Sequence, residues 1–310
     1  MSNTAGHWQM IPFSACLLLC LYVMSRESSR TTAVAGIGMG QRGGQKQDSY
    51  VNVSAAQDSL DRESSGRYNR VISMGLYGDK PRYTYGALMN ALLVERDWPG
   101  WKLRVYYDAS VPSLFISRLE SLGADMVFVN SSAGEDDQGG LIWRFYPMLD
   151  SSLTRFIVRD SDARLTLRDR KAVEEWIDTK AFFHGERDAP GHDRAIMGGL
   201  WGAVGGFITP ALHQKLVDVF RNDAVRFDDD QLFLAEYVWP FVRSHAVVHD
   251  SYYCETFGDG TKETLPFPSK RTNLQDFVGN SLRSDEDFMG ESLTVECPAK
   301  CRRDVSWNYC

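Results

Sequence analysis

Two carboxylates, Asp160 and Asp162, stand one residue apart just after the strand-like run 155–158, whose last three residues are apolar. If the chain bends there, both side chains face one cation, and hard ions such as Mn²⁺ or Mg²⁺ prefer oxygen ligands and leave positions for phosphate oxygens. The flanking Arg159 and Arg164 either contact the same anion or hold the carboxylates in place. The alternative is a polar strand-to-helix turn in which an aspartate caps the following helix, because Asp-x-Asp triplets are common.

The elements that position this motif alternate between strand and helix patterns. The strand patterns cover 71–77, 103–107, 126–129 and 155–158, and the helix patterns cover 84–95, 113–122, 142–149 and 167–178. Such alternation predicts an α/β fold with a mostly parallel, Rossmann-like central sheet flanked by helices. Ligands of these sheets bind at the carboxyl ends of the strands, so Tyr77, Gly78 and Asp108 join the aspartates as candidate binding residues.

Composition excludes several classes of protein. The chain has 310 residues, a net charge of -7 and 43% hydrophobic residues, and its mean hydropathy is -0.32. These values are typical of a globular protein and exclude a multi-span membrane protein. The negative charge argues against a broad basic face for nucleic acid, so no nucleic-acid partner is expected.

The first 69 residues differ from the rest. Residues 1–24 carry no Asp, Glu, Lys or Arg, and their apolar run 10–24 is about 22 Å long as a helix, shorter than a hydrocarbon core of ~30 Å. A short signal-anchor, a cleaved signal peptide and a buried helix compete, and the anchor is preferred. Residues 25–69 have few large apolar side chains and are predicted to be a flexible stem.

Cysteines gather near the end of the chain. Four of the six are Cys254, Cys297, Cys301 and Cys310. In a secreted protein they predict two disulfides, with three possible pairings. Zinc is the weaker alternative. Cys297 and Cys301 have a loose ligand spacing, but no second tight pair of cysteines and no pair of histidines accompanies them. Glycosylation triplets begin at Asn52 and Asn130, and such triplets often arise by chance.

A longer string of residues resembles Golgi-type glycosyltransferases of the GT-A fold. The resemblance rests on 159–165, 172–176, His184, 187–192 and 198–202, and it covers about 71–255. Where the group has Pro-His, Gly191 intervenes here before His192. The resemblance implies a single GT-A-like catalytic core over 70–255, behind the stem, with a disulfide-containing extension over 256–310 packed on it.

The resemblance also implies the ligands. A GT-A enzyme uses a nucleotide-sugar donor, here a UDP- or GDP-sugar, and Asp160 and Asp162 would hold Mn²⁺ or Mg²⁺ against its diphosphate. A third metal ligand in such enzymes often comes from a late histidine. His249 is preferred over His245, because it follows the apolar run 246–248 and would stand at the end of a strand. The alternative for either is an ordinary turn histidine.

A glycine-rich segment, 198–206, follows the motif and is interpreted as a loop. Gly199 would let the backbone approach a donor or acceptor closely, and Trp201 would stack on a sugar face. Alternatively the glycines serve turns and the tryptophan is a core residue.

Two further polar segments are candidates. Asp229 and Asp230 stand at the start of an apolar helix, where the helix dipole favours carboxylates. Alternatively, one of them lies at the acceptor hydroxyl and acts as general base or stabilises the sugar cation. Arg187, Asp188 and His192 line the donor pocket or form a polar loop.

The leading hypothesis is a metal-dependent glycosyltransferase that moves a sugar to a glycan or glycoprotein. The anchor would make it a single-pass type II protein of the Golgi membrane with a lumenal catalytic domain; secretion is the alternative. The competing functions are a non-catalytic glycan-binding protein on the same fold and a metal-dependent phosphohydrolase.

Overall fold

The computed structural model describes residues 50–130, 140–222, 229–257, 260–282 and 290–310. They belong to one compact unit that spans Gly44–Cys310. The apolar run 10–24, expected to be an anchor, lies outside the described residues. Within the described part of the chain, we find no helix with the length and apolar character needed to span a bilayer.

The strands of the described residues form one eight-stranded sheet in the order β3-β2-β1-β4-β6-β5-β7-β8. Its strands are β1 (Arg70–Leu76), β2 (Trp101–Tyr107), β3 (Asp125–Phe128), β4 (Arg155–Val158), β5 (Phe183–Arg187), β6 (Trp201–Val204), β7 (Ala246–Asp250) and β8 (Glu263–Leu265). Only β6 runs against its neighbours, and the other pairings are parallel. The predicted α/β fold with a mostly parallel sheet is therefore confirmed.

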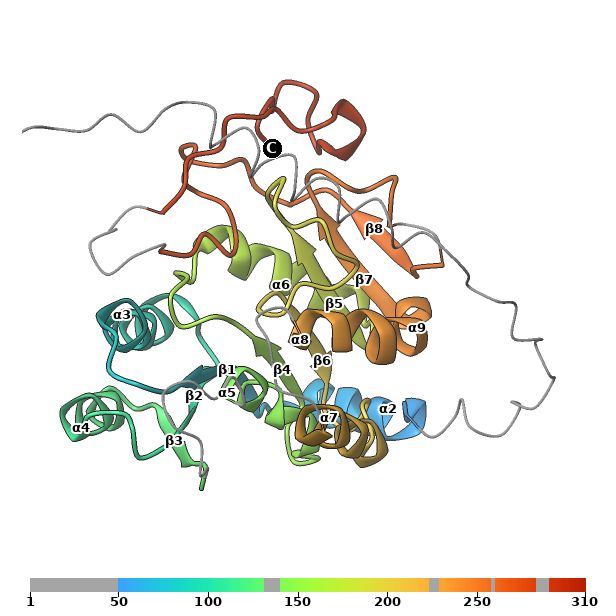
Figure 1. The fold of residues 1–310 in the computed structure, drawn as a ribbon. Coiled ribbons are helices and arrows are strands. Elements are labelled where there is room, and N and C mark those ends of the chain that lie inside the picture. The colour runs from blue at the N-terminus through green and yellow to red at the C-terminus, as the bar shows by residue number, and fades with distance from the viewer. Residues whose placement is uncertain (1–49, 131–139, 223–228, 258–259, 283–289) are drawn as a thin grey trace, which may run out of the picture. The chain divides into compact units, whose positions relative to one another are not determined.

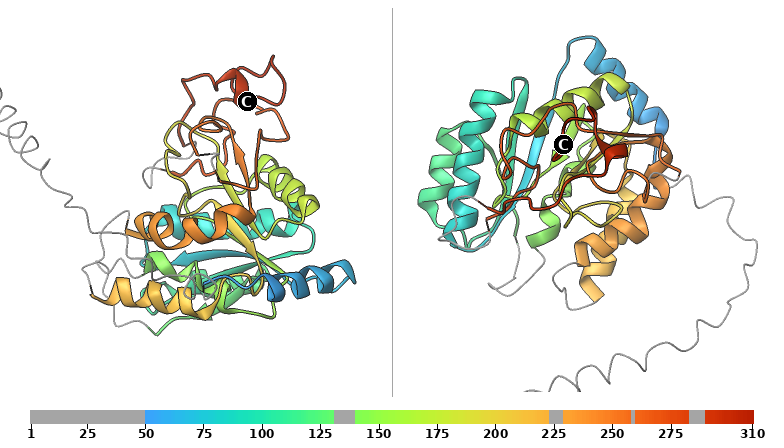
Figure 2. Two further views of the ribbon diagram at one scale, coloured as in Figure 1. Left: turned by 90° about the vertical axis from the view of Figure 1, so that its right-hand side faces the viewer. Right: turned by 90° about the horizontal axis from the view of Figure 1, so that it is seen from above.

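Helices cover both faces of this sheet, as Figures 1 and 2 show. They are α2 (Val53–Ser64), α3 (Pro81–Asp97), α4 (Ser113–Ser121), α5 (Gly140–Trp143), α6 (Leu167–Thr179), α7 (Pro210–Asn222), α8 (Asp229–Phe233) and α9 (Trp239–Val242), with short 3₁₀ or π turns at Tyr146–Leu149, Leu234–Val238, Arg243–His245 and Ala299–Cys301. Helix α6 shows the local causes clearly. The Thr166 side chain accepts a hydrogen bond from the N–H of Asp169, and Lys180 ends the helix in the left-handed conformation.

Helix α2 corrects one expectation. Residues 25–69 were predicted to be a flexible stem, yet Val53–Ser64 is helical and buries Ala56 and Leu60. This helix buries few apolar side chains, and ion pairs help to attach it to the sheet. Glu63 pairs with Arg70 of β1 and with the buried Arg155 of β4, at 2.7 Å each. A composition rule that counts only large apolar residues misses such a helix.

Strand β6 was also missed, because its glycines suggested a loop. A Cβ atom at Gly202 would lie 2.6 Å from the carbonyl oxygen of Phe156, and one at Gly205 would lie 1.9 Å from that of Leu153. The glycines therefore let β6 lie close against the chain of β4.

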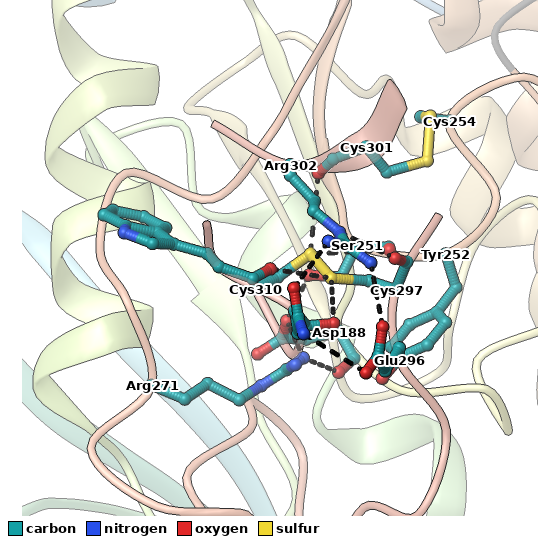
Figure 3. Close-up of a disulfide and its surroundings, with 12 residues drawn as sticks. Asp188, Ser251, Tyr252, Cys254, Arg271, Glu296, Cys297, Cys301, Arg302 and Cys310 are labelled. Atoms are coloured by element: carbon teal, nitrogen blue, oxygen red, sulfur yellow. Dashed lines mark hydrogen bonds and ion pairs between the residues drawn. A yellow bond between two sulfur atoms is a disulfide. The ribbon is translucent and has the colours of Figure 1, made fainter. Parts of the chain in front are cut away.

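The C-terminal segment is tied to the rest of the fold by charge and by one disulfide, and a second disulfide lies within it. The pairs are Cys254–Cys301 and Cys297–Cys310, which selects one of the three possible pairings. Beside them, Arg271 reaches the buried Asp188, as Figure 3 shows. The same segment supplies β8, which extends the sheet next to β7.

Candidate functional site

A pocket of about 320 Å³ opens where β1 and β4 end. The register explains its walls. Val158 at the end of β4 pairs with Trp201 at the start of the antiparallel β6, so residues after 158 lie beside residues before 201. Asp160 and Asp162 therefore meet Gly198 and Gly199 at one edge of the sheet. All four residues line the pocket, in agreement with the rule that ligands bind at strand carboxyl ends.

One arginine bridges two carboxylates in this pocket. The guanidinium of Arg144 donates to Oδ1 of Asp160 and, at 2.5 Å, to Oδ2 of Asp230. Asp230 is 4% exposed, and burial raises the pKa of its carboxyl, with a further contribution from Asp160 against the lowering effect of Arg144. Arg144 thus holds together aspartates that are 70 residues apart in the sequence.

Asp162 is the least compensated carboxylate of the site. Burial, followed by the negative charge of Asp160, raises its pKa to about 6. Burial of Tyr83, followed by the charge of Asp162, raises the pKa of this neighbouring phenol to about 12. Negative potential therefore accumulates at this point, and a cation placed there would relieve it.

The two aspartates fit a hard divalent ion. Their oxygens are the ligands that Mn²⁺ and Mg²⁺ prefer. A Cβ at Gly199 would lie 2.2 Å from Oδ2 of Asp160, so glycine is needed to leave the carboxylate in place. Among the residues that the structure describes, no group of three or more His, Cys, Asp or Glu side chains is placed to hold a metal. The remaining ligands of such an ion would have to come from its substrate and from water.

The C-terminal segment completes the pocket. Gly279 and Ser281 line it, Ser281 forms a β-bridge with Ala163, and the N–H of Leu282 donates to the carbonyl oxygen of Asp162 at 3.1 Å. The loop that carries the Asp-x-Asp motif is therefore braced from outside the region that carried the sequence resemblance.

Asp188 anchors this segment. Its carboxylate accepts two hydrogen bonds from Arg168, at 2.7 and 2.8 Å, and one from Arg271 at 2.6 Å. Ser251 and the N–H of Val278 add bonds of 2.6 and 2.9 Å. Although burial opposes it, the two guanidinium groups hold the pKa of Asp188 at about 2.

His192, which the sequence places either in a donor pocket or in a polar loop, lines this pocket. The backbone N–H of Asp188 donates to its Nδ1 at 2.9 Å, so Nδ1 carries no proton. Burial lowers the pKa of the imidazole to about 4. The neutral ring therefore keeps its proton on Nε2 and can act there as a hydrogen-bond donor, but not as a base.

Several predicted residues do line the pocket, namely Tyr77, Arg159, Asp160, Asp162, His192, Gly199 and Asp230. The guanidinium of Arg159, however, is committed to Asp169 and Glu186, at 2.7 and 2.6 Å. It supports the sheet rather than offering a free charge to an anion. The side chain of Asp229 lies outside the described residues.

Two predictions for aromatic side chains do not hold. Trp201, expected to stack on a sugar, is fully buried and packs on Phe183, with ring centroids 5.5 Å apart. Its strand runs away from the pocket into the core. His249, expected as third metal ligand, lies inside β7 rather than after it, because the strand continues to Asp250. Its ring nitrogens contact His184 and Glu175, at 2.8 and 2.9 Å.

Three other candidates lie beside the pocket and do not line it. Gly78 and Asp108 are brought together by Ser110, whose hydroxyl accepts from the N–H of Gly78 at 2.7 Å and contacts the Asp108 carboxylate at 2.5 Å. Arg164 donates to the carbonyl oxygen of Ser161 at 3.4 Å. These contacts shape the turns next to the pocket.

Sequence reasoning missed the most central side chain. Arg144 lies just after the short α5 (Gly140–Trp143), within a stretch expected to be one regular helix. An isolated arginine in such a stretch gives no local signal, because its partners Asp160 and Asp230 are distant in sequence. Gly279 and Ser281 were missed for the same reason.

Comparison with known proteins adds little to this geometry. No protein-family model and no curated protein sequence matches the chain. Among solved structures, glucosyl-3-phosphoglycerate synthase from Mycobacterium tuberculosis, bound to Mn²⁺, UDP-glucose and phosphoglyceric acid, is 15% identical over 47% of this chain, with a TM-score of 0.32. A mannosyltransferase from Pyrobaculum calidifontis, in complex with GDP-Man and Mn²⁺, is 13% identical over 63% of this chain, with a TM-score of 0.38.

The matched regions span 59% and 62% of the lengths of those two proteins. Mannosyl-3-phosphoglycerate synthase from Rubrobacter xylanophilus is 13% identical over 47% of this chain and 56% of its own, with a TM-score of 0.33. These neighbours are nucleotide-sugar glycosyltransferases, but similarity at this level carries no argument for the activity of this chain. The function has to be argued from the pocket.

Proposed function

We propose that this protein is a divalent-metal-dependent glycosyltransferase that takes a sugar from a nucleotide-diphosphate donor, a UDP- or GDP-sugar, and transfers it to a glycan or glycoprotein. The observation that supports this most is the charge of the pocket. Asp160, Asp162 and Asp230 line it together, Arg144 pairs with the first and the last of them, and the pKa of Asp162 is raised to about 6.

Such a pocket does not suit a free anion, yet it suits a diphosphate that arrives with a divalent cation. Asp160 and Asp162 would hold the cation. When bound, a divalent ion in such a site stabilises the negative charge that grows on the diphosphate as the sugar leaves. This contribution is larger in the transition state than in the ground state, which is what catalysis requires.

The chain's own residues then orient the reaction. Arg144 fixes the carboxylates of Asp160 and Asp230, so both point into the pocket before substrate arrives. Asp230 is the candidate general base or cation stabiliser, and His192 offers an Nε2–H donor to a substrate oxygen. Tyr77 and Tyr83 supply aromatic walls.

In the transfer itself, a bond forms between the acceptor oxygen and the anomeric carbon. The bond from that carbon to the diphosphate oxygen breaks, and its electron pair stays on the diphosphate. The proton of the acceptor hydroxyl passes to a carboxylate or to solvent. Atoms and charges balance without any redox partner.

The two disulfides support a location in an oxidising compartment. We therefore propose that the protein works in the secretory pathway, in the Golgi membrane with its catalytic domain in the lumen. The membrane attachment would come from residues 1–24.

A donor panel tests the function. Incubated with Mn²⁺ and a series of UDP- and GDP-sugars, the protein is expected to release nucleotide diphosphate from one of them. Asp162→Asn should abolish the release, while chelation with EDTA should do so reversibly. Binding of glycan without any metal-dependent nucleotide binding would instead identify a non-catalytic glycan-binding protein.

A further inference from the structure

A second pocket, of about 370 Å³, lies beside the first. One wall is the loop 189–192 after β5, and the other is formed by two stretches of the C-terminal segment, 277–281 and 291–295. Asn280 joins these two stretches, since its amide donates to the carbonyl oxygen of Glu291 at 3.0 Å and accepts from the N–H of Glu291 at 2.8 Å. The pocket is thus built by a fixed fold of the chain.

The two pockets share part of their walls. His192, Gly279 and Ser281 line both of them. Gly279 has a φ of +80°, and a Cβ there would lie 2.9 Å from Leu200 and 3.3 Å from the Cε1 of His192. A larger residue would crowd the junction, so the glycine keeps the shared wall thin. A molecule in the second pocket therefore lies next to whatever occupies the first.

The lining of the second pocket indicates the chemistry of its occupant. It combines apolar surface from Pro190, Phe277 and Leu293 with hydroxyl groups from Ser292 and Thr294. Among the described residues that line it, none is lysine or arginine. Apolar faces with scattered hydroxyl partners suit a carbohydrate, whereas a phosphorylated molecule would find no basic side chain among the described residues of the lining.

We propose that the second pocket is the acceptor site and that the acceptor is a neutral carbohydrate. This inference rests on the proposed function, because it assumes that the first pocket holds the donor. The hydroxyl to be glycosylated enters past Gly279, and the Nε2–H of His192 donates to an oxygen at the junction. The bond changes are those given above, with the hydroxyl oxygen of the bound sugar as the attacking atom.

Gly191 offers a clean way to block the site. It lines the second pocket and not the first, its φ lies outside the left-handed region, and a Cβ there would meet no atom within 4 Å. Gly191→Phe should therefore fold and place a bulky ring at the wall of the pocket. Val305→Phe is the matched control, because Val305 is 83% exposed in the same segment and lines neither pocket.

The experiment is saturation-transfer NMR with two sets of probes. The first set is the methyl glycosides of common neutral hexoses, pentoses and N-acetylhexosamines, together with the corresponding sugar 1-phosphates. The second set is UDP and GDP with Mn²⁺. We expect at least one neutral glycoside to bind the unmodified protein and Val305→Phe, and to bind Gly191→Phe at least tenfold more weakly. Nucleotide binding should be equal in all three.

Either of two results would overturn the acceptor site: glycoside binding that is unchanged in Gly191→Phe, or binding of sugar phosphates with no binding of neutral glycosides. If neither UDP nor GDP binds the unmodified protein or either variant in the presence of Mn²⁺, the result contradicts the proposed function instead. The two failures are therefore distinguishable in one set of spectra.

Discussion

Two arginine–carboxylate clusters lie near the carboxyl ends of neighbouring parts of the sheet, and they are built in opposite ways. The anchor cluster gathers Arg168, Arg271 and Ser251 around the single carboxylate of Asp188. In the pocket cluster the guanidinium of Arg144 pairs with the carboxylates of Asp160 and Asp230, and Asp162 lines the same pocket. The single carboxylate of Asp188 accepts hydrogen bonds from several donors. In the pocket, two carboxylates share one guanidinium.

The pKa values express the same contrast. That of Asp188 is held at about 2 by its arginines, against the effect of burial. That of Asp162 is raised to about 6 by burial and by Asp160. Removing a carboxylate whose charge is fully paired leaves buried arginines unpaired and destabilises the fold. A carboxylate with a raised pKa and incomplete pairing is instead typical of a site that binds a ligand. The two clusters should therefore respond oppositely to removal of a carboxylate.

The largest expected effect is on activity. Asp162→Asn or Asp160→Asn should lower transfer by about 10³-fold, since the site would lose a group that holds the cation at the developing charge. Neither change should lower the free energy of unfolding by much, and Asp162→Asn should raise it or leave it unchanged, because it removes a repelled buried charge. Rates on a responsive donor and urea denaturation measure both. Asp193→Asn, at a carboxylate that is 63% exposed, is the control.

The opposite pattern is expected for the anchor cluster. Asp188→Asn leaves Arg168 and Arg271 without their counter-charge, so the free energy of unfolding should fall by about 3–5 kcal/mol. Urea denaturation checks the value. A variant as stable as the original would show that the cluster does not hold the C-terminal segment.

The acid sensitivity of the fold is a smaller effect. Burial lowers the pKa of His184 well below its usual value and lowers that of His192 to about 4. Both stay neutral in the folded protein while the unfolded chain takes up protons below about pH 6.5, so stability is present above that pH and falls as the pH is lowered. Each histidine contributes up to about 1.4 kcal/mol per pH unit in this window.

Denaturation at pH 7, 6 and 5 measures this slope. His184→Phe should make it shallower, whatever the variant does to stability at pH 7. Asp162 titrates in the opposite direction and is common to both proteins. An identical slope would mean that His184 is protonated in the folded state.

The smallest effect concerns the hydrogen bond that His192 donates at the junction of the two pockets. His192→Leu removes the Nε2–H and should slow transfer about tenfold, the worth of roughly one neutral hydrogen bond. His192→Gln places an amide N–H near the same position and should recover much of the rate. Equal losses in both variants, together with lowered stability in both, would assign His192 a structural role only.

The sequence predicted the parts of this account that depend on neighbours along the chain. Strand β4 and the aspartates that follow it lie where the apolar run and the triplet place them, because a buried strand has to end where carboxylates begin. The histidine that was expected as third ligand failed on a boundary error of two residues, since β7 continues through His249 to Asp250. Inside a strand, its side chain had to find buried partners.

Other parts depend on contacts between distant residues, and no local pattern reports them. Arg144 contacts Asp230, which is 86 residues away in the sequence. Leu282, in the loop closed by the Cys254–Cys301 disulfide, donates its N–H to the carbonyl oxygen of Asp162. Trp201 was misjudged because glycines around it suggested a loop, while they serve the close packing of β6 on β4. Such pairings follow from the three-dimensional register of the sheet.

The central claim is that the pocket binds a nucleotide diphosphate only together with a divalent cation held by Asp160 and Asp162. Thermal unfolding with UDP or GDP, with and without Mn²⁺, tests it most directly. Binding at a hundredfold excess over Kd adds about 2.7 kcal/mol of stability, so one nucleotide with Mn²⁺ should raise Tm by several degrees. Neither component alone should do so, and Asp162→Asn should show no rise. Equal stabilisation by the nucleotide without metal, or none under any condition, would contradict the account.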